Sequence, residues 1–494
     1  MKPLLLTLLL PVLCACFAPH SLPQTPATAA PATKVPLLSA EALQADFDLL
    51  FDGLRSAHFE LFARRSETEY RALHAQMRAQ MTQPMSLTDA QLQFQRFVAY
   101  GRVAHARIEL PTEPWSRFRE AGGRAFPLSF RVVGEAVHVL DNYSGHDALA
   151  TGARVLAVDG EPALAWLHRM GDLVSADSDY LLEVQLERTL PMLVWLQRGE
   201  VDGFELEVEG AAGERERLRL PARTRTEALA SEQKQPPRFA LDFNVRAATG
   251  LDDGIAYLRP GPFYDNRDGA DGPWDPSAFR LFIDRAFVDF RSARATRLLI
   301  DLRDNPGGDN SFSDHLLAYI ANRPFRFARE FDMRASPQTR AAFAARIAEE
   351  GDVSSITARL QAAMAGVPDG AAVKFEIEAT PPREEGRFEG QVFALINRHS
   401  YSNAVMVAAT LQDYGFGTLL GEETADLGST LGAMERFILP RTGFSVGYPK
   451  ARILRPNGNP QPRGVVPEVR IVTPLNASSE DEVLEQALQW IRAS

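Results

Sequence analysis

The stretch Asn397–Gly415, NRHSYSNAVMVAATLQDYG, follows the short apolar run Val392–Ile396 and continues as an almost entirely apolar segment. The run has the length of a buried strand, and the segment from Ser402 to about Tyr414 is long enough for a helix. Ser402 therefore lies at a strand-to-helix junction. Serine commonly caps helices, but a helix N-terminus also favours developing negative charge beside a nucleophile. The residues alone leave both interpretations open.

Strands and helices alternate through the last half of the chain, residues 241–494. The segments RLLIDLR, QVFALIN and GTLLGE read as strands, and SFSDHLLAYIAN and the segment after Ser402 read as helices. Strands that alternate with helices pair in parallel through right-handed crossovers. The predicted fold class of this region is α/β.

A second strand-to-helix junction lies upstream, at LLIDLRDNPGGDNS. Leu298–Arg303 is predicted to be a strand that ends in a sharp turn. Gly307 and Gly308 in this turn allow positive φ and leave peptide N–H groups uncovered by side chains. Such donors can stabilise an oxyanion. Ligands of α/β sheets bind beyond the carboxyl ends of strands, which is where both junctions lie.

The first half of the chain is predicted to hold a helical domain, a β-rich domain and a linker. Residues 37–115 have apolar side chains at helical spacing, with Ser39 and Ser86 as candidate N-caps. Residues 120–225 have short alternating runs separated by glycine, which favours strands. The polar segment 226–240 is the predicted linker.

One part of the β-rich region has a more specific pattern. TGARVLAVDGEPA, Thr151–Ala163, resembles the part of a PDZ-like domain in which two strands flank a turn before a helix. The helix is expected in PALAWLHRMGDLV. The resemblance implies a PDZ-like β-rich domain over residues 120–225.

The N-terminus has the form of an export signal. Residues 1–16 contain Lys2, the apolar run Leu4–Leu13 and small residues at the end. LCAC also resembles a bacterial lipoprotein cleavage site with Cys16 as the lipidated residue; plain secretion with cleavage elsewhere is the alternative. Residues 17–36, rich in Pro, Ala, Ser and Thr, are predicted to be a flexible tether. The chain is expected to cross the bacterial inner membrane and to be periplasmic or a membrane-anchored lipoprotein.

Composition argues against two classes of partner. The 494 residues have a formal net charge of -11 and no large basic block, so nucleic acid is an unsuitable partner. No apolar run after the signal is long enough to cross a membrane, so membrane contact is expected only through the lipid anchor. Both cysteines, Cys14 and Cys16, lie in the signal, so the mature chain cannot form an internal disulfide.

The two junctions together carry a family resemblance. LLIDLRDNPGG, followed by NRHSYSNAVMVAATLQDYGFGTLLGEET and GVVPE, resembles the tail-specific (C-terminal-processing) and tricorn-type serine peptidases over about Gly254–Val472. The resemblance implies a crotonase-like α/β core, a polypeptide substrate, and no metal or cofactor. By position, it makes Ser402 the nucleophile, places the oxyanion donors on the N–H groups of Gly307–Gly308 and Asn403, and matches Asp413 to a supporting acid.

The sequence departs from the lysine-dependent branch of this family. Leu427, in GEETADLGST, occupies the position of the general-base lysine. Histidine is the natural substitute, because its pKa is about 6.5. His105 is the predicted base, because FVAYGRVAHARIELP resembles the DGH element of tricorn-like members, here reduced to VAHA. His399 is the alternative base, and His58 is expected to pack or line the cleft.

A third residue is needed to orient the base and fix its tautomer. Gln461 occupies the position of the glutamate that precedes the GVxPD motif in tricorn-like members, here Gly464–Glu468. A neutral amide can orient a histidine but stabilises imidazolium less. Glu435, and Glu422 or Glu423, are alternatives that the sequence does not separate.

Three acids around the glycine turn raise a metal site as an alternative. Asp301, Asp304 and Asp309 have no histidine or second cluster at ligand spacing, so no metal is predicted.

Taken with the family resemblance, the sequence predicts an exported serine-type endopeptidase that forms an acyl-enzyme on Ser402. The alternative is a catalytically inactive relative that binds peptides or ligands in the envelope; hydrolysis of a non-peptide ester also stays open.

Overall fold

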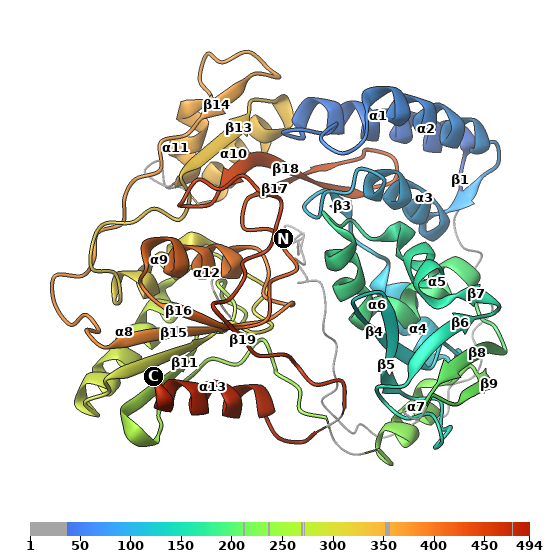
Figure 1. Ribbon diagram of the computed structural model, residues 1–494. Coiled ribbons are helices and arrows are strands. Elements are labelled where there is room, and N and C mark those ends of the chain that lie inside the picture. Colours follow the sequence, from blue (N-terminus) through green and yellow to red (C-terminus); the bar gives the residue numbers. More distant parts are fainter. Residues whose placement is uncertain are drawn as a thin grey trace, which may run out of the picture.

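The computed structural model describes residues 37–210, 213–235, 238–267, 270, 272–350, 356–476 and 478–494. The predicted signal (1–16), the candidate lipidated Cys16 and the predicted tether (17–36) lie outside the described residues. The protein has an α/β fold in which helices and sheets are distributed over three regions (Figure 1).

The central sheet has six strands, of which all but the first run parallel. In sheet order they are β10 (Ala247–Gly250), β11 (Ile255–Arg259), β12 (Arg297–Asp301), β15 (Gln391–Ile396), β16 (Thr418–Gly421) and β19 (Val469–Arg470). A parallel sheet needs cover on both faces, and successive residues of β12 supply it: Leu298 and Ile300 face one core, Leu299 the other.

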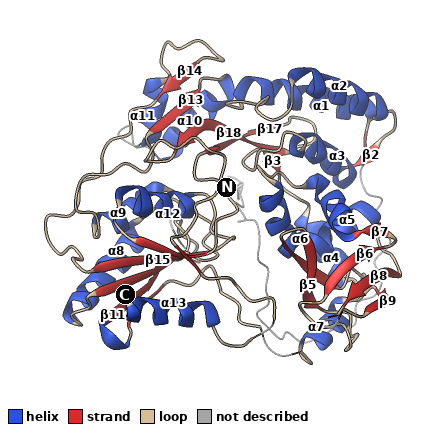
Figure 2. Ribbon diagram, viewed as in Figure 1, coloured by secondary structure: helices blue, strands red, loops and turns tan. Residues whose placement is uncertain are grey.

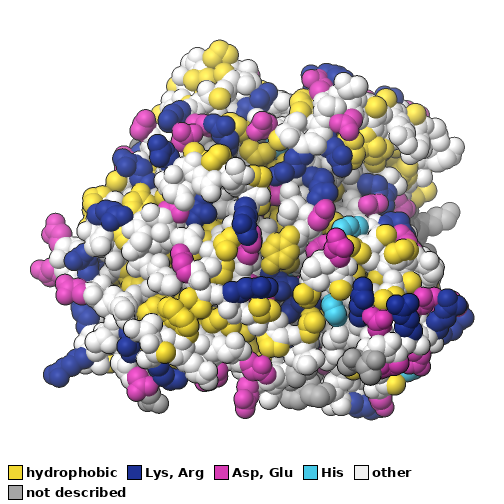
Figure 3. All heavy atoms as spheres, viewed as in Figure 1, with side chains coloured by type: hydrophobic (Ala, Val, Ile, Leu, Met, Phe, Trp, Pro, Cys, Tyr) yellow, Lys and Arg dark blue, Asp and Glu magenta, His cyan; other side chains and the backbone are white. Residues whose placement is uncertain are grey.

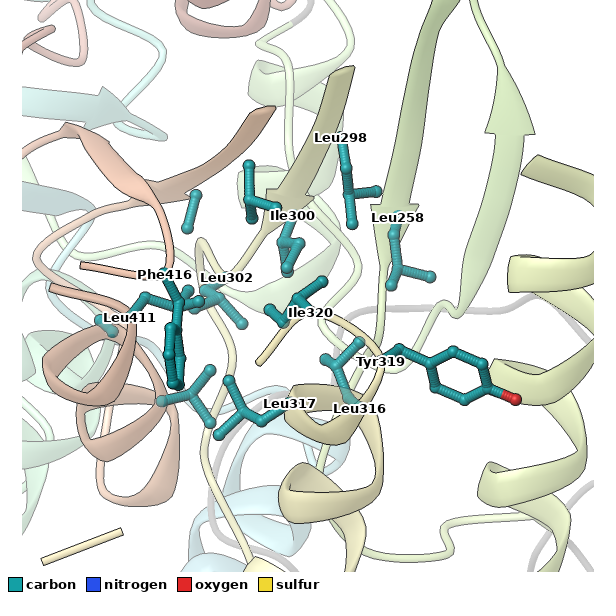
Figure 4. Close-up of a cluster of buried hydrophobic side chains, with 14 of the residues drawn as sticks. Leu258, Leu298, Ile300, Leu302, Leu316, Leu317, Tyr319, Ile320, Leu411 and Phe416 are labelled. Carbon is teal, nitrogen blue, oxygen red and sulfur yellow. The ribbon is translucent and has the colours of Figure 1, made fainter. Parts of the chain in front are cut away.

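Helices cover the two faces. The first core packs the sheet against α8 (Ser277–Ser292), α9 (Asn310–Ala318) and α12 (Asn403–Tyr414). Figure 4 shows side chains of β11, β12, α9 and the end of α12 pointing into this core. The opposite core contains α13 (Glu482–Ala493), which lies across the sheet from α9 and α12 (Figure 1). The parallel sheet and its helices agree with the predicted α/β core.

A second, antiparallel sheet was not part of the prediction. It joins β14 (Ala372–Lys374), β13 (Glu330–Arg334), β18 (Ser445–Leu454) and β17 (Thr430–Ile438), and β3 (Arg107–Ile108) also pairs with β18. Helices α10 (Pro337–Glu350) and α11 (Ile356–Ala363) lie on it. The β3 pairing brings the segment around His105 to this sheet.

The N-terminal helices are α1 (Ala40–Ala57), α2 (Glu67–Gln80), α3 (Leu87–Ala99) and the short α4 (Thr112–Glu120), with a small β1 (Leu37–Leu38) and β2 (Met85–Ser86) pair. As predicted, Ser39 and Ser86 are N-caps: their hydroxyls accept the N–H groups of Ala42 and Asp89 at 3.2 and 3.1 Å. Helices α1, α2 and α3 share one hydrophobic cluster with Leu439, Phe444, Val446 and Tyr448 of the β17–β18 region.

The β-rich region is an antiparallel sheet with two helices packed on it (Figure 2). In sheet order its strands are β4 (Leu128–Val133), β5 (Ala136–Asn142), β6 (Arg154–Val158), β8 (Gly203–Glu209) and β9 (Arg215–Pro221), with β7 (Glu161–Pro162) beside β6. The helices are α5 (Ala163–Met170), in the segment where a helix was expected, and α6 (Asp179–Arg198), which was not predicted.

The predicted linker contains a helix. Helix α7 covers Arg225–Glu232, and Thr224 begins it with a capping box that includes Glu227. The polar composition that favoured a linker is, in this part, that of an exposed and well-capped helix. Pro236 and Pro237 lie outside the described residues.

Candidate active site

Ser402 has a backbone conformation that is rare for a residue with a side chain. It lies between β15 and α12 with φ 53° and ψ −121°, which costs on the order of 1–3 kcal/mol unless the surroundings enforce it. Its N–H donates to Oδ2 of Asp426 at 2.6 Å. Its side chain makes no capping hydrogen bond to α12. The structure therefore does not support the helix-cap interpretation of this serine.

The turn before Ser402 is fixed to the end of β12. The buried Ser400 hydroxyl donates to the Leu302 carbonyl at 2.8 Å and accepts the Asn397 N–H at 3.1 Å. The Asn397 side-chain oxygen accepts the Asp304 N–H at 3.1 Å, and the Tyr401 N–H donates to the Asn305 carbonyl at 2.9 Å. These bonds join the two predicted junctions into one site.

The glycine turn lies against Ser402. A Cβ atom on Gly307 (φ 85°) would lie 2.6 Å from the Asn403 nitrogen and 2.8 Å from Cβ of Ser402. A Cβ atom on Gly308 (φ 138°) would lie 2.1 Å from the Phe263 carbonyl oxygen. Both positions therefore require glycine, because this approach leaves no room for a side chain.

Of the three predicted oxyanion donors, two are available. The Gly307 N–H donates to Oδ1 of Asn305 at 2.9 Å, so the expectation that Gly307 is a donor is corrected: its role is to permit the close approach. Within the described residues, the N–H groups of Gly308 and Asn403 have no hydrogen-bond acceptor. They are the donors that a developing oxyanion beside Ser402 could use.

His105 contacts Tyr401, the residue before Ser402. Its ring stacks on the Tyr401 ring with 5.6 Å between centroids and 23° between planes. Burial and the nearby Arg107 guanidinium lower the pKa of His105 to about 4, so the imidazole is neutral at pH 7 and can accept a proton. Its Nδ1 is buried and has no hydrogen-bond partner in the described part of the chain.

The structure does not bring the predicted orienting residues to His105. Gln461 is exposed, and its N–H donates to Oδ1 of Asn459 at 3.0 Å. Glu435 is buried between Lys450 and Arg346, with ion pairs of 2.7 and 2.8 Å. Glu422 and Glu423 pair with Arg398 and Arg463, at 3.0 and 2.8 Å. No hydrogen bond joins any of these four to His105 or Ser402 among the described residues.

The other candidates have partners of their own. His399 contacts Oε2 of Glu187 on α6 at 3.3 Å. His58 is buried, accepts the Glu60 N–H at Nδ1, and its pKa is lowered to about 3 by burial and by Arg334. Asp413 pairs with Arg455 at 2.7 Å.

The acids around the glycine turn have structural partners. Asp301 pairs with Arg303 at 2.7 Å, Asp304 with Arg188 at 2.9 Å, and Asp309 caps α9. No group of three or more His, Cys, Asp or Glu side chains that could hold a metal ion occurs in the described ranges.

Two carboxylates near Ser402 were missed by the sequence interpretation. Asp426, one residue before Leu427, accepts the Ser402 N–H, and Asp177, just before α6, accepts the Ala104 N–H at 3.1 Å. The position of Asp426 within GEETADL was a usable signal. Nothing in the sequence near Asp177 indicates that it reaches this site.

The face of the molecule in Figure 3 mixes lysine and arginine with aspartate and glutamate, without a large block of one sign. No helix within the described residues has the length and apolarity needed to span a membrane.

Comparisons with known proteins show a family match and a similar fold. Residues 278–471 match the model of peptidase family S41. The fold is similar to the crystal structure of mature CPAF, with a TM-score of 0.59 and 15% sequence identity over 87% of this chain and 92% of that one. It is also similar to mature CPAF complexed with lactacystin, with a TM-score of 0.60 and 15% identity over 92% and 97%. A search of curated protein sequences found no significant match.

Proposed function

Because residues 278–471 match the model of peptidase family S41, we propose that this chain is a serine-type endopeptidase with Ser402 as its nucleophile. The observation that carries the proposal is the strained Ser402 backbone beside two free donors. Among the described residues, the N–H groups of Gly308 and Asn403 have no hydrogen-bond acceptor. A serine placed in this way combines a nucleophile with an oxyanion site.

The reaction proceeds through an acyl-enzyme. The Ser402 hydroxyl attacks the peptide carbonyl, and His105 takes the hydroxyl proton and passes it to the leaving amine. The N–H groups of Gly308 and Asn403 donate to the tetrahedral oxyanion. Water then hydrolyses the ester on Ser402 and releases the acyl part of the substrate. Leu427, buried in place of the family's lysine, leaves the base role to histidine.

The β-rich region has a surface suited to a polypeptide substrate. In our proposal residues 120–225 are a PDZ-like domain, and its edge strand β9 pairs with only one of the described strands, β8. An extended peptide could add to such an edge through main-chain hydrogen bonds.

Export is part of the same proposal and rests on residues 1–36. The measurement is the intact mass of the protein recovered from the envelope of a bacterial host. A mature N-terminus that carries lipid on Cys16 would support the proposal, and an uncleaved N-terminus would contradict it.

The test of the nucleophile is covalent labelling of the mature protein with a fluorophosphonate, measured by intact mass. One adduct is expected on the wild type and none on Ser402→Ala, because the probe reacts only with an activated serine. Circular dichroism and a thermal unfolding curve show whether the variant is folded. An adduct that persists in a folded Ser402→Ala protein would exclude Ser402 as the nucleophile.

The second candidate function is peptide binding without catalysis. It is favoured by one observation: no described carboxylate or amide hydrogen-bonds to Nδ1 of His105. This function predicts that the folded wild type forms no adduct and releases no product, yet binds extended peptides. Peptide cleavage that stops in Ser402→Ala would contradict it.

A further inference from the structure

Asp426 is held against the backbone of Ser402. Its Oδ2 accepts the Ser402 N–H at 2.6 Å and its Oδ1 accepts the Leu427 N–H at 2.9 Å. The Asp426 backbone is itself fixed, since its carbonyl accepts the Thr424 hydroxyl at 2.8 Å. The residue is 1% exposed. A buried carboxylate therefore contacts the one residue that the proposed mechanism needs in a strained conformation.

No cation pairs with Asp426 in the described part of the chain, which is unusual for a buried carboxylate. The groups that face it come from three elements: Asp177 from the segment before α6, Arg107 from β3, and Tyr401 from the turn before α12. His105 stacks on Tyr401, and Arg64 pairs with Asp177 at 3.2 Å. Asp177 thus has a cation of its own, whereas Asp426 is held by hydrogen bonds.

We propose that Asp426 is a positioning residue for Ser402, and that its ionised carboxylate, by accepting the Ser402 N–H, holds the serine in the positive-φ backbone conformation from which it attacks. This inference rests on the proposed function, because it takes Ser402 as the nucleophile. It also explains why the oxyanion donors are Gly308 and Asn403: the Ser402 N–H is already engaged.

The arrangement makes the reactivity of Ser402 depend on pH. Burial and the neighbouring Asp177 carboxylate raise the pKa of Asp426 to about 7. A hydrogen bond to an ionised acceptor is roughly twice as strong as one to a neutral acceptor, so protonation of Asp426 weakens its hold on Ser402. The expected effect is a roughly five- to tenfold rise in reactivity as pH increases through the pKa of Asp426. Titration of His105 lies far lower, at a pKa of about 4.

The experiment measures the rate of fluorophosphonate labelling of the full mature chain across the neutral pH range, from acidic to alkaline buffer. The wild type should show the rise near the pKa of Asp426, about 7. In Asp426→Asn the rise should vanish, because the amide oxygen can accept the N–H but does not titrate. In Asp177→Asn the rise should move to lower pH, because a neighbouring negative charge is gone. A rise that persists in Asp426→Asn, or an unshifted midpoint in Asp177→Asn, would overturn the proposal.

A matched control is Asp314→Asn. Burial raises the pKa of Asp314 to about 6, and its carboxylate accepts the Thr380 hydroxyl and an Asn310 side-chain N–H rather than the Ser402 N–H. This variant should keep the wild-type profile, and loss of the rise there would also contradict the proposal.

The outcomes separate the two proposals. Absence of labelling in the wild type at every pH contradicts the proposed function itself, whereas an unchanged profile in Asp426→Asn contradicts only the role of Asp426. If Asp426→Asn does not fold, Asp177→Asn decides the question.

Discussion

Gly307 determines, at the scale of single residues, how closely the glycine turn approaches Ser402. Its N–H donates to the Asn305 side chain, and its missing Cβ atom leaves the space that the Asn403 nitrogen and Cβ of Ser402 occupy. The site therefore requires glycine at position 307 as well as the N–H donors of Gly308 and Asn403.

Gly307→Ala is expected to reduce the labelling rate of Ser402 by roughly 10²- to 10³-fold, because the added methyl must displace Asn403 and with it one oxyanion donor. The measurement is the fluorophosphonate rate at a fixed pH. Gly122→Ala is the control: Gly122 has a similar φ of 88°, but a Cβ there meets nothing within 4 Å. Equal rates in the two variants would show that contact with Asn403 does not explain the effect.

The choice of base is decided by comparing two histidines. His105→Ala should lose roughly 10²- to 10⁴-fold in peptide hydrolysis, the range of general-base catalysis. His399→Ala should lose less, since His399 contacts Glu187 on α6. The measurement is the initial rate of cleavage of an unstructured polypeptide at neutral pH. The reverse order would move the base to His399.

At the scale of elements, α6 connects the β-rich region to the turn before Ser402. Glu187 of α6 pairs with Arg131 of β4 at 3.2 Å and with Arg398 at 3.1 Å, and it also contacts His399. Glu187 and both arginines are buried. Because the charges of the two arginines meet on one carboxylate, α6 and the turn that carries Ser402 are held together.

Glu187→Gln should destabilise the protein by about 3–5 kcal/mol, because it leaves the buried Arg131 without its paired carboxylate and leaves Arg398 with Glu422 alone. Burial raises the pKa of Glu187, but the hydrogen bond with His399 and the charges of His399, Arg131 and Arg398 outweigh it and hold the value at about 2. The stability due to this carboxylate is therefore present above the unfolded pKa of about 4.3 and lost as pH falls through the folded value. The measurement is the free energy of unfolding in urea at neutral and at acidic pH.

Glu183→Gln is the matched control on the same helix. Glu183 contacts His168 at 2.9 Å, within the β-rich region rather than at the turn before Ser402. A loss in Glu183→Gln as large as that in Glu187→Gln would contradict a special role for the Glu187 contacts.

The elements that sequence predicts are those whose pattern is local. The strand at Leu298, the strand before Asn397 and the helix after Ser402 were predicted because apolar runs and turn glycines lie within a few residues of one another. Helix α6 was missed because Pro191 interrupts its pattern, although Ser178 and Gly199 mark its ends. The antiparallel sheet of β13, β14, β17 and β18 depends on pairings between distant segments, which no local pattern reports.

In the candidate site, too, residues within local motifs could be predicted, whereas residues brought in by distant segments could not. Ser402, Gly308 and Asn403 lie in two short motifs and could be named from sequence. Asp177 reaches the site only because of how the segment before α6 packs, and the position of Gln461 at the surface reflects how its loop folds around Asn459. Spacing in the sequence does not determine either outcome.

At the scale of the whole molecule, the N-terminal helices and the C-terminal strands form one core. Phe47, Leu50 and Phe97 share a cluster with Val446 and Tyr448. The β3–β18 pairing adds main-chain hydrogen bonds between the same two parts of the chain.

A fragment of residues 241–494 should therefore lack the stability of the full chain, because it exposes the side chains of β18 that α1 and α3 cover. The measurement is thermal unfolding by circular dichroism, with binding of a hydrophobic dye as a second readout. The full mature chain is the control. Cooperative unfolding of the fragment at the same temperature as the full chain would contradict this prediction.

The shared cluster also sets an order of events during synthesis. Helix α1 ends at Ala57, and β17 begins only at Thr430. At about 5–20 residues per second, the ribosome needs roughly 20–75 seconds to make the chain between them. Throughout that interval the side chains of α1 lack β17 and β18 and can be buried only against the partners already made, which are α2, α3 and β3.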